Sequence, residues 1–420
     1  MEKLKNINKE KLWSKHYILM MITALFIMTS MQMSMTTLPV YAQYIGESKS
    51  IAGFTTGIIA ISAFLFRPLF GNLLDSKGRK IILVIGIIIF SLTTLSYNFV
   101  YTIVIILILR FIQGIGFSAY SNAGGTIIAD VVPGSRLSEG VGLFILVNII
   151  AMAFGPTIGL KFTEKSNYNA LFILTFILAG IGLVCAFFIN YERKEEKFKT
   201  LKLKSDCKDG EMDIPTETKG RIIKKNIFFE KTAIPVSLAQ FFISLSLGSI
   251  LTFLPLYALS QNIENIGIFF TVYAIAALCV RIIGGRLADN HGPSWIILPG
   301  MLILALSLAI LAFAASMNVF LIAAVLFGFG FGAVQPTLNA IMIKLCPINR
   351  RGVGNATMFS AIDIGIGLGS ILWGFIAEEL GFTYIYLGSA VSVFLALIVY
   401  LLMVKKQLER SEHKQVEKIV

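Results

Sequence analysis

The sequence predicts an all-α membrane protein of twelve transmembrane helices. Of its 420 residues, 56% are hydrophobic and only 14% are charged, with a mean hydropathy of +0.79. A soluble protein usually has roughly 25% charged residues, and a soluble chain of this length could not bury so much apolar surface. Apolar runs of about 20 residues, the length of helix that crosses a bilayer, recur along the whole chain.

The apolar runs form two sets of six. The first set covers residues 17–41, 51–73, 80–97, 100–124, 138–160 and 169–190. The second set covers residues 233–258, 265–287, 295–316, 319–343, 353–376 and 382–404. Strands of a membrane barrel would be about half as long and would alternate apolar with polar residues. The first run, with about 24 apolar residues, exceeds the core of a signal peptide and is expected to be a retained helix.

The Lys and Arg residues predict the orientation of the helices. The chain has 36 of them against 24 Asp and Glu, for a net charge of +12. One set of alternate loops carries only Lys49, Lys161 and Lys165. Because cytoplasmic loops are enriched in Lys and Arg, we expect a plasma-membrane protein whose ends, residues 1–16 and 405–420, are cytoplasmic. The positive charge thus indicates orientation rather than nucleic-acid binding, which needs a basic face on a soluble fold.

The longest polar stretch, residues 191–232, divides the chain into an N-terminal half, residues 17–190, and a C-terminal half, residues 233–404. It mixes basic with acidic side chains, whereas a polybasic lipid-binding patch would lack the acids. We therefore expect a flexible cytoplasmic linker.

An internal repeat relates the two halves. Arg, Gly, Leu, Asp and Gly recur between residues 67–78 and 281–292 at an offset of 214. The same offset relates Gly53 to Gly267, Gly114 to Gly328, Gly116 to Gly330, and Gly155 to Gly369. Chance composition seldom keeps one register over five helices. We therefore predict two pseudo-symmetric six-helix halves about an axis along the membrane normal, with a substrate site between them.

The loop after the second predicted helix carries a signature. Its residues are Gly71, Leu73, Asp75, Gly78, Arg79 and Lys80. They resemble the G-x-L-x-D-x-x-G-R-[KR] loop of the major facilitator superfamily, whose members are transporters. Gly78 is expected to permit a tight turn and Gly71 a close helix approach. The resemblance implies that Asp75 is a latch between the halves on the cytoplasmic side, where it can face the positive end of a helix.

The second half keeps a partial copy of this signature in Gly285, Asp289 and Gly292, while Pro293 replaces the second Arg. The alternative is a generic basic loop that follows the positive-inside rule. Both copies keep an Asp and two glycines, which favours the signature.

The fourth predicted helix contains Arg110, Gln113, Gly114 and Gly116, which is similar to the R-x-x-Q-G-x-G signature of the same superfamily. An arginine this far inside a span must be paired, hydrated or functional. Two interpretations remain: Arg110 takes part in coupling or charge recognition, or it is a structural arginine bound by neighbouring carbonyl groups.

The fifth predicted helix contains Gly155, Pro156 and Gly159, a pattern that resembles the export-associated G-x-x-x-G-P-x-x-G-G signature without its first and last glycines. Pro156 removes a backbone donor and is expected to kink the helix. The two glycines permit close packing. The resemblance implies the drug:proton antiporters of the superfamily and, from weaker similarity elsewhere, the branch that holds opine-metallophore exporters.

Asp363 is the acid that lies deepest in a predicted span. A carboxylate within the membrane is a functional hypothesis by default, because burial and nearby cations shift its pKa and make it a possible proton carrier. The alternative is that Asp363 bonds the backbone amides of the glycines that follow it.

Polar side chains at helical spacing predict a neutral, hydrogen-bonding cavity. The candidates are Gln32, Thr36, Gln113, Ser121, Asn148, Gln240, Gln335 and Asn339. Residues four apart on a helix share a face. For each of them the alternative is a hydrogen bond that joins two helices.

We therefore expect a secondary active transporter rather than an enzyme: a monomeric exporter of small amphipathic drugs or metallophore-like metabolites. Inward protons would drive it through Arg110 and Asp363. The alternative is a permease for a polar or anionic metabolite, with Arg110 as counter-charge. A non-transporting sensor or an enzyme is disfavoured, because the sequence has no nucleotide-binding loop, paired carboxylates or metal cluster. Beyond substrate, protons and the lipid bilayer, we expect no cofactor, metal or nucleic acid.

Overall fold

The structure of the protein is a computed structural model that describes residues 12–192, 229–347 and 350–416. Within these ranges, the side chains of residues 72, 75, 138, 282–291 and 411–416 lie outside the description. The predicted linker and the predicted N-terminal segment therefore fall largely outside the described residues.

The described chain is helical, as predicted. The N-terminal half consists of α1 (Lys15–Tyr44), α2 (Lys49–Lys77), α3 (Arg79–Ser96), α4 (Ile103–Val131), α5 (Leu137–Glu164) and α6 (Tyr168–Phe187). The C-terminal half consists of α8 (Ile234–Ser260), α9 (Gly267–His291), α10 (Ser294–Ala312), α11 (Met317–Leu345), α12 (Arg351–Glu379) and α13 (Phe382–Val399). The helix of α13 continues through a π-helical turn, Tyr400–Val404, into α14 (Lys405–Val416).

Eleven of the described helices are long and apolar enough to cross a membrane, and α9 has a shorter apolar stretch, Gly267–Arg281. The prediction of twelve membrane helices is confirmed. Polar residues mark where the chain enters helices: Ser14, Ser48 and Asn167 each accept a hydrogen bond from the backbone N–H three residues on, which satisfies a group that the first turn leaves free.

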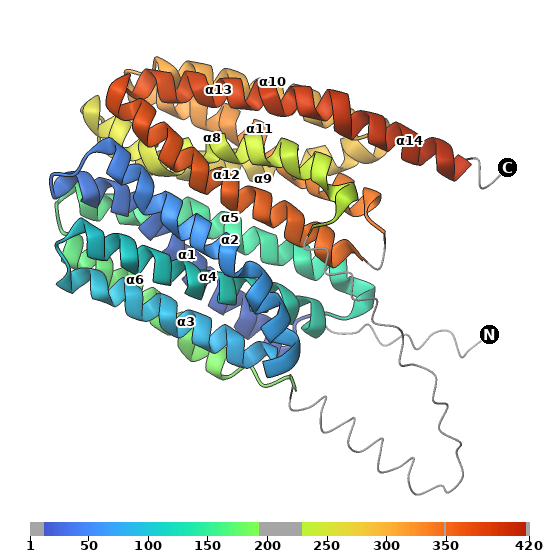
Figure 1. Ribbon diagram of the computed structural model, residues 1–420, viewed down its shortest axis with the longest axis horizontal. Helices are drawn as coiled ribbons and strands as arrows, with labels where there is room; N and C mark the ends of the chain where they lie inside the picture. The colour runs from blue at the N-terminus through green and yellow to red at the C-terminus, as the bar shows by residue number, and fades with distance from the viewer. Residues whose placement is uncertain (1–11, 193–228, 348–349, 417–420) are drawn as a thin grey trace, which may run out of the picture.

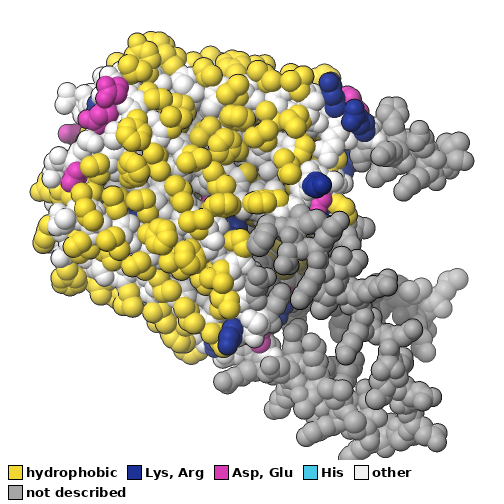
Figure 2. All heavy atoms as spheres, in the orientation of Figure 1, with side chains coloured by type: hydrophobic (Ala, Val, Ile, Leu, Met, Phe, Trp, Pro, Cys, Tyr) yellow, Lys and Arg dark blue, Asp and Glu magenta, His cyan; other side chains and the backbone are white. Residues whose placement is uncertain are grey.

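The two halves lie side by side as two bundles of roughly parallel helices, with α1–α6 forming one bundle and α8–α13 the other (Figure 1). In Figure 2 hydrophobic side chains cover the middle of the visible face, and charged side chains gather at its two ends. An apolar belt of this kind suits contact with lipid tails. We call the end where α1 begins and α14 ends the basic end, and the other end the opposite end.

The internal repeat is also a repeat of packing. A Cβ atom on Gly114 of α4 would lie 2.5 Å from the backbone oxygen of Ile59 in α2. A Cβ atom on Gly328 of α11 would lie 2.5 Å from the backbone oxygen of Tyr273 in α9. Both residues of the second contact lie 214 positions after those of the first. The same glycines therefore bring corresponding helices together in each half.

The halves meet along two seams. Helix α2 packs against α12, and α5 packs against α9, with α2 and α5 at the edge of one half and α9 and α12 at the edge of the other (Figure 1). These α2–α12 and α5–α9 seams are the surfaces along which one half can move relative to the other.

Candidate functional site

The α2–α12 seam is closed at the opposite end of the bundle. A Cβ atom on Gly53 would lie only 2.4 Å from the backbone oxygen of Ser370, so backbone lies against backbone there. The carboxylate of Glu378, at the end of α12, accepts hydrogen bonds from the backbone N–H groups of Lys49 and Ser50 at 2.7 and 3.3 Å. These are the first residues of α2, whose free N–H groups favour an anion.

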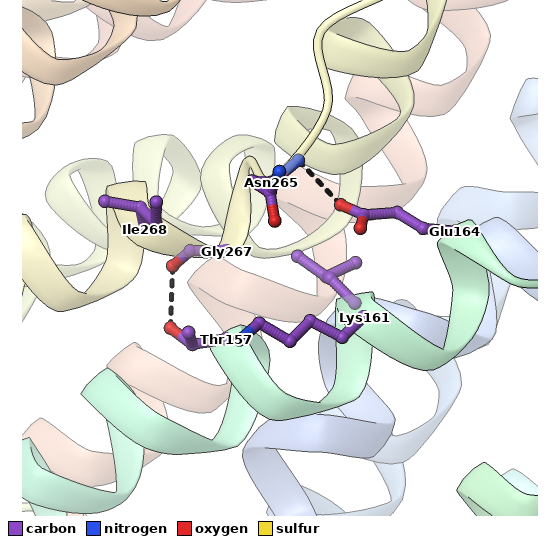
Figure 3. Close-up of a pocket in the computed structure, with 7 residues that line it drawn as sticks. Thr157, Lys161, Glu164, Asn265, Gly267 and Ile268 are labelled. Carbon is purple, nitrogen blue, oxygen red and sulfur yellow. Dashed lines mark hydrogen bonds between the residues drawn. The ribbon is translucent and has the colours of Figure 1, made fainter.

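The α5–α9 seam is closed at the same end. The hydroxyl of Thr157 donates to the backbone oxygen of Gly267 at 2.7 Å, and Glu164 accepts from the backbone N–H of Asn265 at 2.7 Å. Figure 3 shows both bonds beside a small hollow between α5 and α9. A Cβ atom on Gly267 would lie 2.7 Å from the Cα atom of Thr157, so this seam also depends on a glycine.

Glu164 and Glu378 occupy equivalent positions in the repeat, because they are 214 residues apart. Each ends a helix of its own half and accepts from the N–H groups at or just before the start of a helix in the other half. Sequence reasoning missed this pair, although the offset of 214 contains the signal. We call Glu164 and Glu378 the cap carboxylates; together they bridge the two halves at the opposite end.

Replacing both cap carboxylates, Glu164→Gln and Glu378→Gln, should favour opening of the opposite end. Glutamine keeps an acceptor but loses the negative charge that the start of a helix favours. At exposed positions that interaction is worth about 1 kcal/mol for the two glutamates together. Its loss should change the ratio of open to closed opposite end about fivefold. A Ser370→Cys reporter, in a background without native cysteines, should react about five times faster with an impermeant maleimide.

The control for this experiment is Glu379→Gln, which removes an exposed carboxylate next to Glu378 for which the structure shows no hydrogen bond or ion pair among the described residues. Equal labelling rates in the double variant and the control would contradict the proposed role of the caps.

At the basic end, three glycines of the seam helices lie in open space among the described residues. A Cβ atom on Gly71 of α2, Gly142 of α5 or Gly352 of α12 would meet no atom within 4 Å in the described part of the chain. The expected close helix approach at Gly71 is therefore not seen among the described atoms of this state. Contacts that close one end of the bundle are a feature of one of the two end states of alternating access.

Asp363 joins the two halves through an ion pair. Its Oδ2 atom accepts from Nη2 and Nε of Arg67 at 2.5 and 3.0 Å, so α12 and α2 are linked across the seam. The Asp363 side chain is only 13% exposed and the Arg67 side chain only 11%. The guanidinium also lies over the Phe359 ring, 5.4 Å from its centroid. Asp363 thus binds a cation, and not the glycine amides that the alternative interpretation required.

Arg110 lies elsewhere, fully buried between α4 and α1. It donates to the side-chain oxygen of Gln113 at 2.9 Å and to the backbone oxygen of Ser34 at 3.0 Å. Gln113 also accepts from the hydroxyl of Tyr97 at 2.9 Å. The structure therefore does not bring Arg110 and Asp363 together. It places Gln113 in a buried network between α4 and α1, in which its side-chain nitrogen has no hydrogen-bond partner.

The remaining cavity candidates divide into three groups. Thr36, Ser121 and Asn148 bond to carbonyl groups of their own helices. Gln240 donates to Ser244 at 3.2 Å, but its side-chain oxygen is buried and has no hydrogen-bond partner among the described residues. The side-chain oxygen of Asn339 is likewise buried and without a partner. Gln32 and Gln335 are partly buried. Gln240 and Asn339 therefore keep the free hydrogen-bonding capacity that a substrate could use.

A scan against protein-family models matches the chain to the Major Facilitator Superfamily over residues 20–265 and again over residues 236–419. The chain belongs to the major facilitator superfamily. The two overlapping matches cover nearly all of the sequence.

Among curated relatives of this superfamily, a multidrug resistance efflux pump homolog of Lactococcus lactis is 24% identical over 410 residues, covering 95% of this chain and 96% of that protein. A staphylopine export protein of Staphylococcus aureus is 25% identical over 362 residues, covering 83% and 86%. A solved bacterial homolog of the human lysosomal transporter Spinster, inward-facing and unoccupied, aligns with a TM-score of 0.71 at 15% identity, covering 94% and 98%. The last comparison shows the fold alone.

The superfamily loop signature joins α2, α3 and α4 of this chain. Gly78 has a φ of 90°, the left-handed conformation that lets α3 start directly after α2. Arg79 pairs with Asp130 at the end of α4, with 3.0 Å between Nε and Oδ2. Glu192 accepts from the backbone N–H of Arg79 at 2.6 Å and of Lys80 at 3.4 Å. This end of the N-terminal half is thereby fixed as one unit.

Tyr191 completes this cluster, because its hydroxyl donates to Oδ2 of Asp130 at 2.9 Å. Burial and the neighbouring carboxylate raise the pKa of Tyr191, so it remains a donor at physiological pH. The side chains of Asp75 and Asp289, and the surroundings of Gly285, lie outside the described residues, although all three positions are helical. Gly292 has a φ of 88° and open space around it among the described atoms.

The superfamily export pattern brings α5 close to α1. A Cβ atom on Gly155 would lie 2.8 Å from Cβ of Gln32, and one on Gly159 would lie 2.9 Å from Cγ2 of Thr37. Pro156 lies within the helix without ending it. The two glycines therefore place α5 directly against the helix that carries Gln32 and Thr36.

Proposed function

We propose that the chain is a proton-coupled exporter of small amphipathic compounds, drugs or metallophore-like metabolites, that works by alternating access. The observation that carries this proposal is the nearly buried ion pair between Arg67 and Asp363, which links the two halves across a seam. An ion pair at this position makes the relative position of the halves depend on the charge of one carboxylate.

The coupling step is a change in the protonation of Asp363. Deprotonated Asp363 attracts Arg67 and holds α2 against α12, whereas a protonated carboxyl loses most of that attraction. An ion pair taken out of water is favourable only while both partners are charged. Proton binding therefore favours separation of the α2–α12 seam, and proton release favours its closure.

The direction of transport follows from the orientation. If the basic end faces the cytoplasm, as the positive-inside rule indicates, the described state is closed to the outside by the cap carboxylates and open to the inside. Both termini then lie in the cytoplasm, and the chain works as a monomer in the plasma membrane. The names of the relatives, a multidrug resistance efflux pump homolog and a staphylopine export protein, support outward transport.

The substrate would contact the amides of Gln240 and Asn339, whose free oxygens accept hydrogen bonds. Gln240 and its partner Ser244 belong to α8, and a Cβ atom on Gly365 would lie 2.6 Å from Cβ of Ser244. Gly365 follows Asp363 by two residues. A bound substrate would therefore lie close to the coupling pair, where its presence can alter the environment of the carboxylate.

Substrate-evoked proton movement tests this proposal. Purified protein in liposomes with an imposed pH gradient should acidify or alkalinise the lumen, read by a pH-sensitive dye, when ethidium is added as an amphipathic probe. Empty liposomes and an ionophore-treated sample are the controls. Ethidium flux without proton movement would refute coupling, and the absence of both would refute the exporter.

A further inference from the structure

Arg281 of α9 is the repeat equivalent of Arg67, because 214 residues separate them. It also belongs to the face that α9 turns toward α5. Gly267 and Thr271 contact Thr157, and Ala274 packs in one cluster with Ile149 of α5. The α9 residues on this face follow one another at spacings of three or four: Gly267, Thr271, Ala274, Leu278 and Arg281. They therefore share one helix face.

Arg67 has an acid partner, Asp363, but α5 has no acid at the equivalent position for Arg281. Asp363 and Phe359, which contact Arg67, correspond at the offset of 214 to Ile149 and Ile145 of α5. In the described part of the chain, no carboxylate forms an ion pair with Arg281, and its buried Nε atom has no hydrogen-bond partner. The repeat has thus kept the arginine and lost its acid.

An unpaired guanidinium within a membrane helix is costly. Two other arginines inside described helices have partners, Arg67 in Asp363 and Arg110 in Gln113 and Ser34, although the Nε atom of Arg110 also makes no hydrogen bond. Arg281 lies at the end of the apolar stretch Gly267–Arg281, toward the basic end, where a Cβ atom on Gly142 of α5 would meet no described atom within 4 Å. Among the described residues, Arg281 is therefore a cation without an acid partner, near the basic end of the α5–α9 seam.

We propose that Arg281 binds an anionic group of the substrate, a carboxylate or a phosphate, in the place that an aspartate occupies in the other seam. The inference rests on the proposed function and adds to its substrate class amphipathic compounds that carry such a group. A guanidinium offers several donors in a fork that matches both oxyanions. A bound substrate then gives the α5–α9 seam an ion pair at the position where Arg67 and Asp363 form one in the α2–α12 seam.

The experiment measures binding to purified full-length protein in phosphatidylcholine nanodiscs by fluorescence anisotropy. The probes are carboxyfluorescein, an aromatic anion, and ethidium, an aromatic cation. We expect Arg281→Gln to weaken carboxyfluorescein binding between about tenfold and a hundredfold, the loss typical of a charged hydrogen bond, and to leave ethidium binding unchanged. Arg281→Lys should retain most of the affinity, because it keeps the charge.

Two further variants make the test specific. Ile149→Asp should restore the missing acid, pair with Arg281 and also abolish carboxyfluorescein binding without removing the arginine. Arg136→Gln is the matched control, because Arg136 is a partly exposed arginine at the basic end that pairs with Glu139, and it should bind both probes like the parent chain.

Unchanged carboxyfluorescein binding in Arg281→Gln, or none in the parent chain, would overturn the inference. An effect that appears only after phosphatidylglycerol is added to the discs would also overturn it, in favour of a lipid headgroup. These outcomes are separate from those of the proton assay: ethidium-evoked proton movement without carboxyfluorescein binding leaves the exporter standing, and Arg281-dependent binding without proton movement leaves only the inference.

Discussion

Asp363→Asn is expected to abolish proton coupling, reducing substrate-evoked proton movement at least about tenfold. Asparagine has nearly the same shape and keeps an acceptor for Arg67, but it neither ionises nor carries the charge that holds α2 to α12. Leaving Arg67 uncompensated at a site where it is only 11% exposed also costs about 3–5 kcal/mol. The measurement compares dye-reported proton flux with the flux of ethidium in the same liposomes.

Two companion variants separate coupling from damage to the fold. The exchange Arg67→Asp with Asp363→Arg should recover part of the proton movement, because it restores an ion pair across the same seam. Glu264→Gln removes an exposed carboxylate of the loop before α9 and should have no effect. Normal proton flux in Asp363→Asn would exclude this carboxylate as the coupling group.

Gly53→Val is expected to remove nearly all transport, because it prevents closure of the opposite end. Even a Cβ atom at this position would lie 2.4 Å from the Ser370 backbone oxygen, well inside the contact distance of real Cβ atoms, and backbone cannot move aside as a flexible side chain can. The α2–α12 seam must then separate at this end. The variant should show an increased labelling rate of Ser370→Cys together with lost ethidium flux.

The matched control is Gly180→Val on α6, where a Cβ atom would meet no described atom within 4 Å. It makes the same chemical change in a membrane helix without touching a seam, so transport should be retained. Full transport in Gly53→Val would mean that the halves do not need this close contact to complete the cycle.

The helices and the repeat could be predicted because their signals are local. A run of about 20 apolar residues has few alternatives to a membrane helix, and the glycines at an offset of 214 mark where each half packs closely. The loop signature could also be recognised, since Gly78, Arg79 and Lys80 act within one turn and its immediate neighbours.

The partners of the charged residues could not be predicted in the same way. Sequence reasoning grouped Arg110 with Asp363, because both are charges inside spans. The structure instead pairs Asp363 with Arg67, 296 residues away, and encloses Arg110 among Gln113 and Ser34. The spacing within a helix says which residues share a face, but the neighbour that this face meets depends on how the helices pack.

The sequence by itself thus determined the membrane class, the twelve helices, the twofold repeat and the superfamily, since each depends on hydropathy or on short motifs that act within one helix or loop. Only the tertiary structure decided which end of the bundle is closed, which carboxylates cap helices of the other half, and which arginine lacks an acid. The physical reason is that these features are contacts between two halves, and their energies depend on distances of a few ångströms set by the glycine-lined seams.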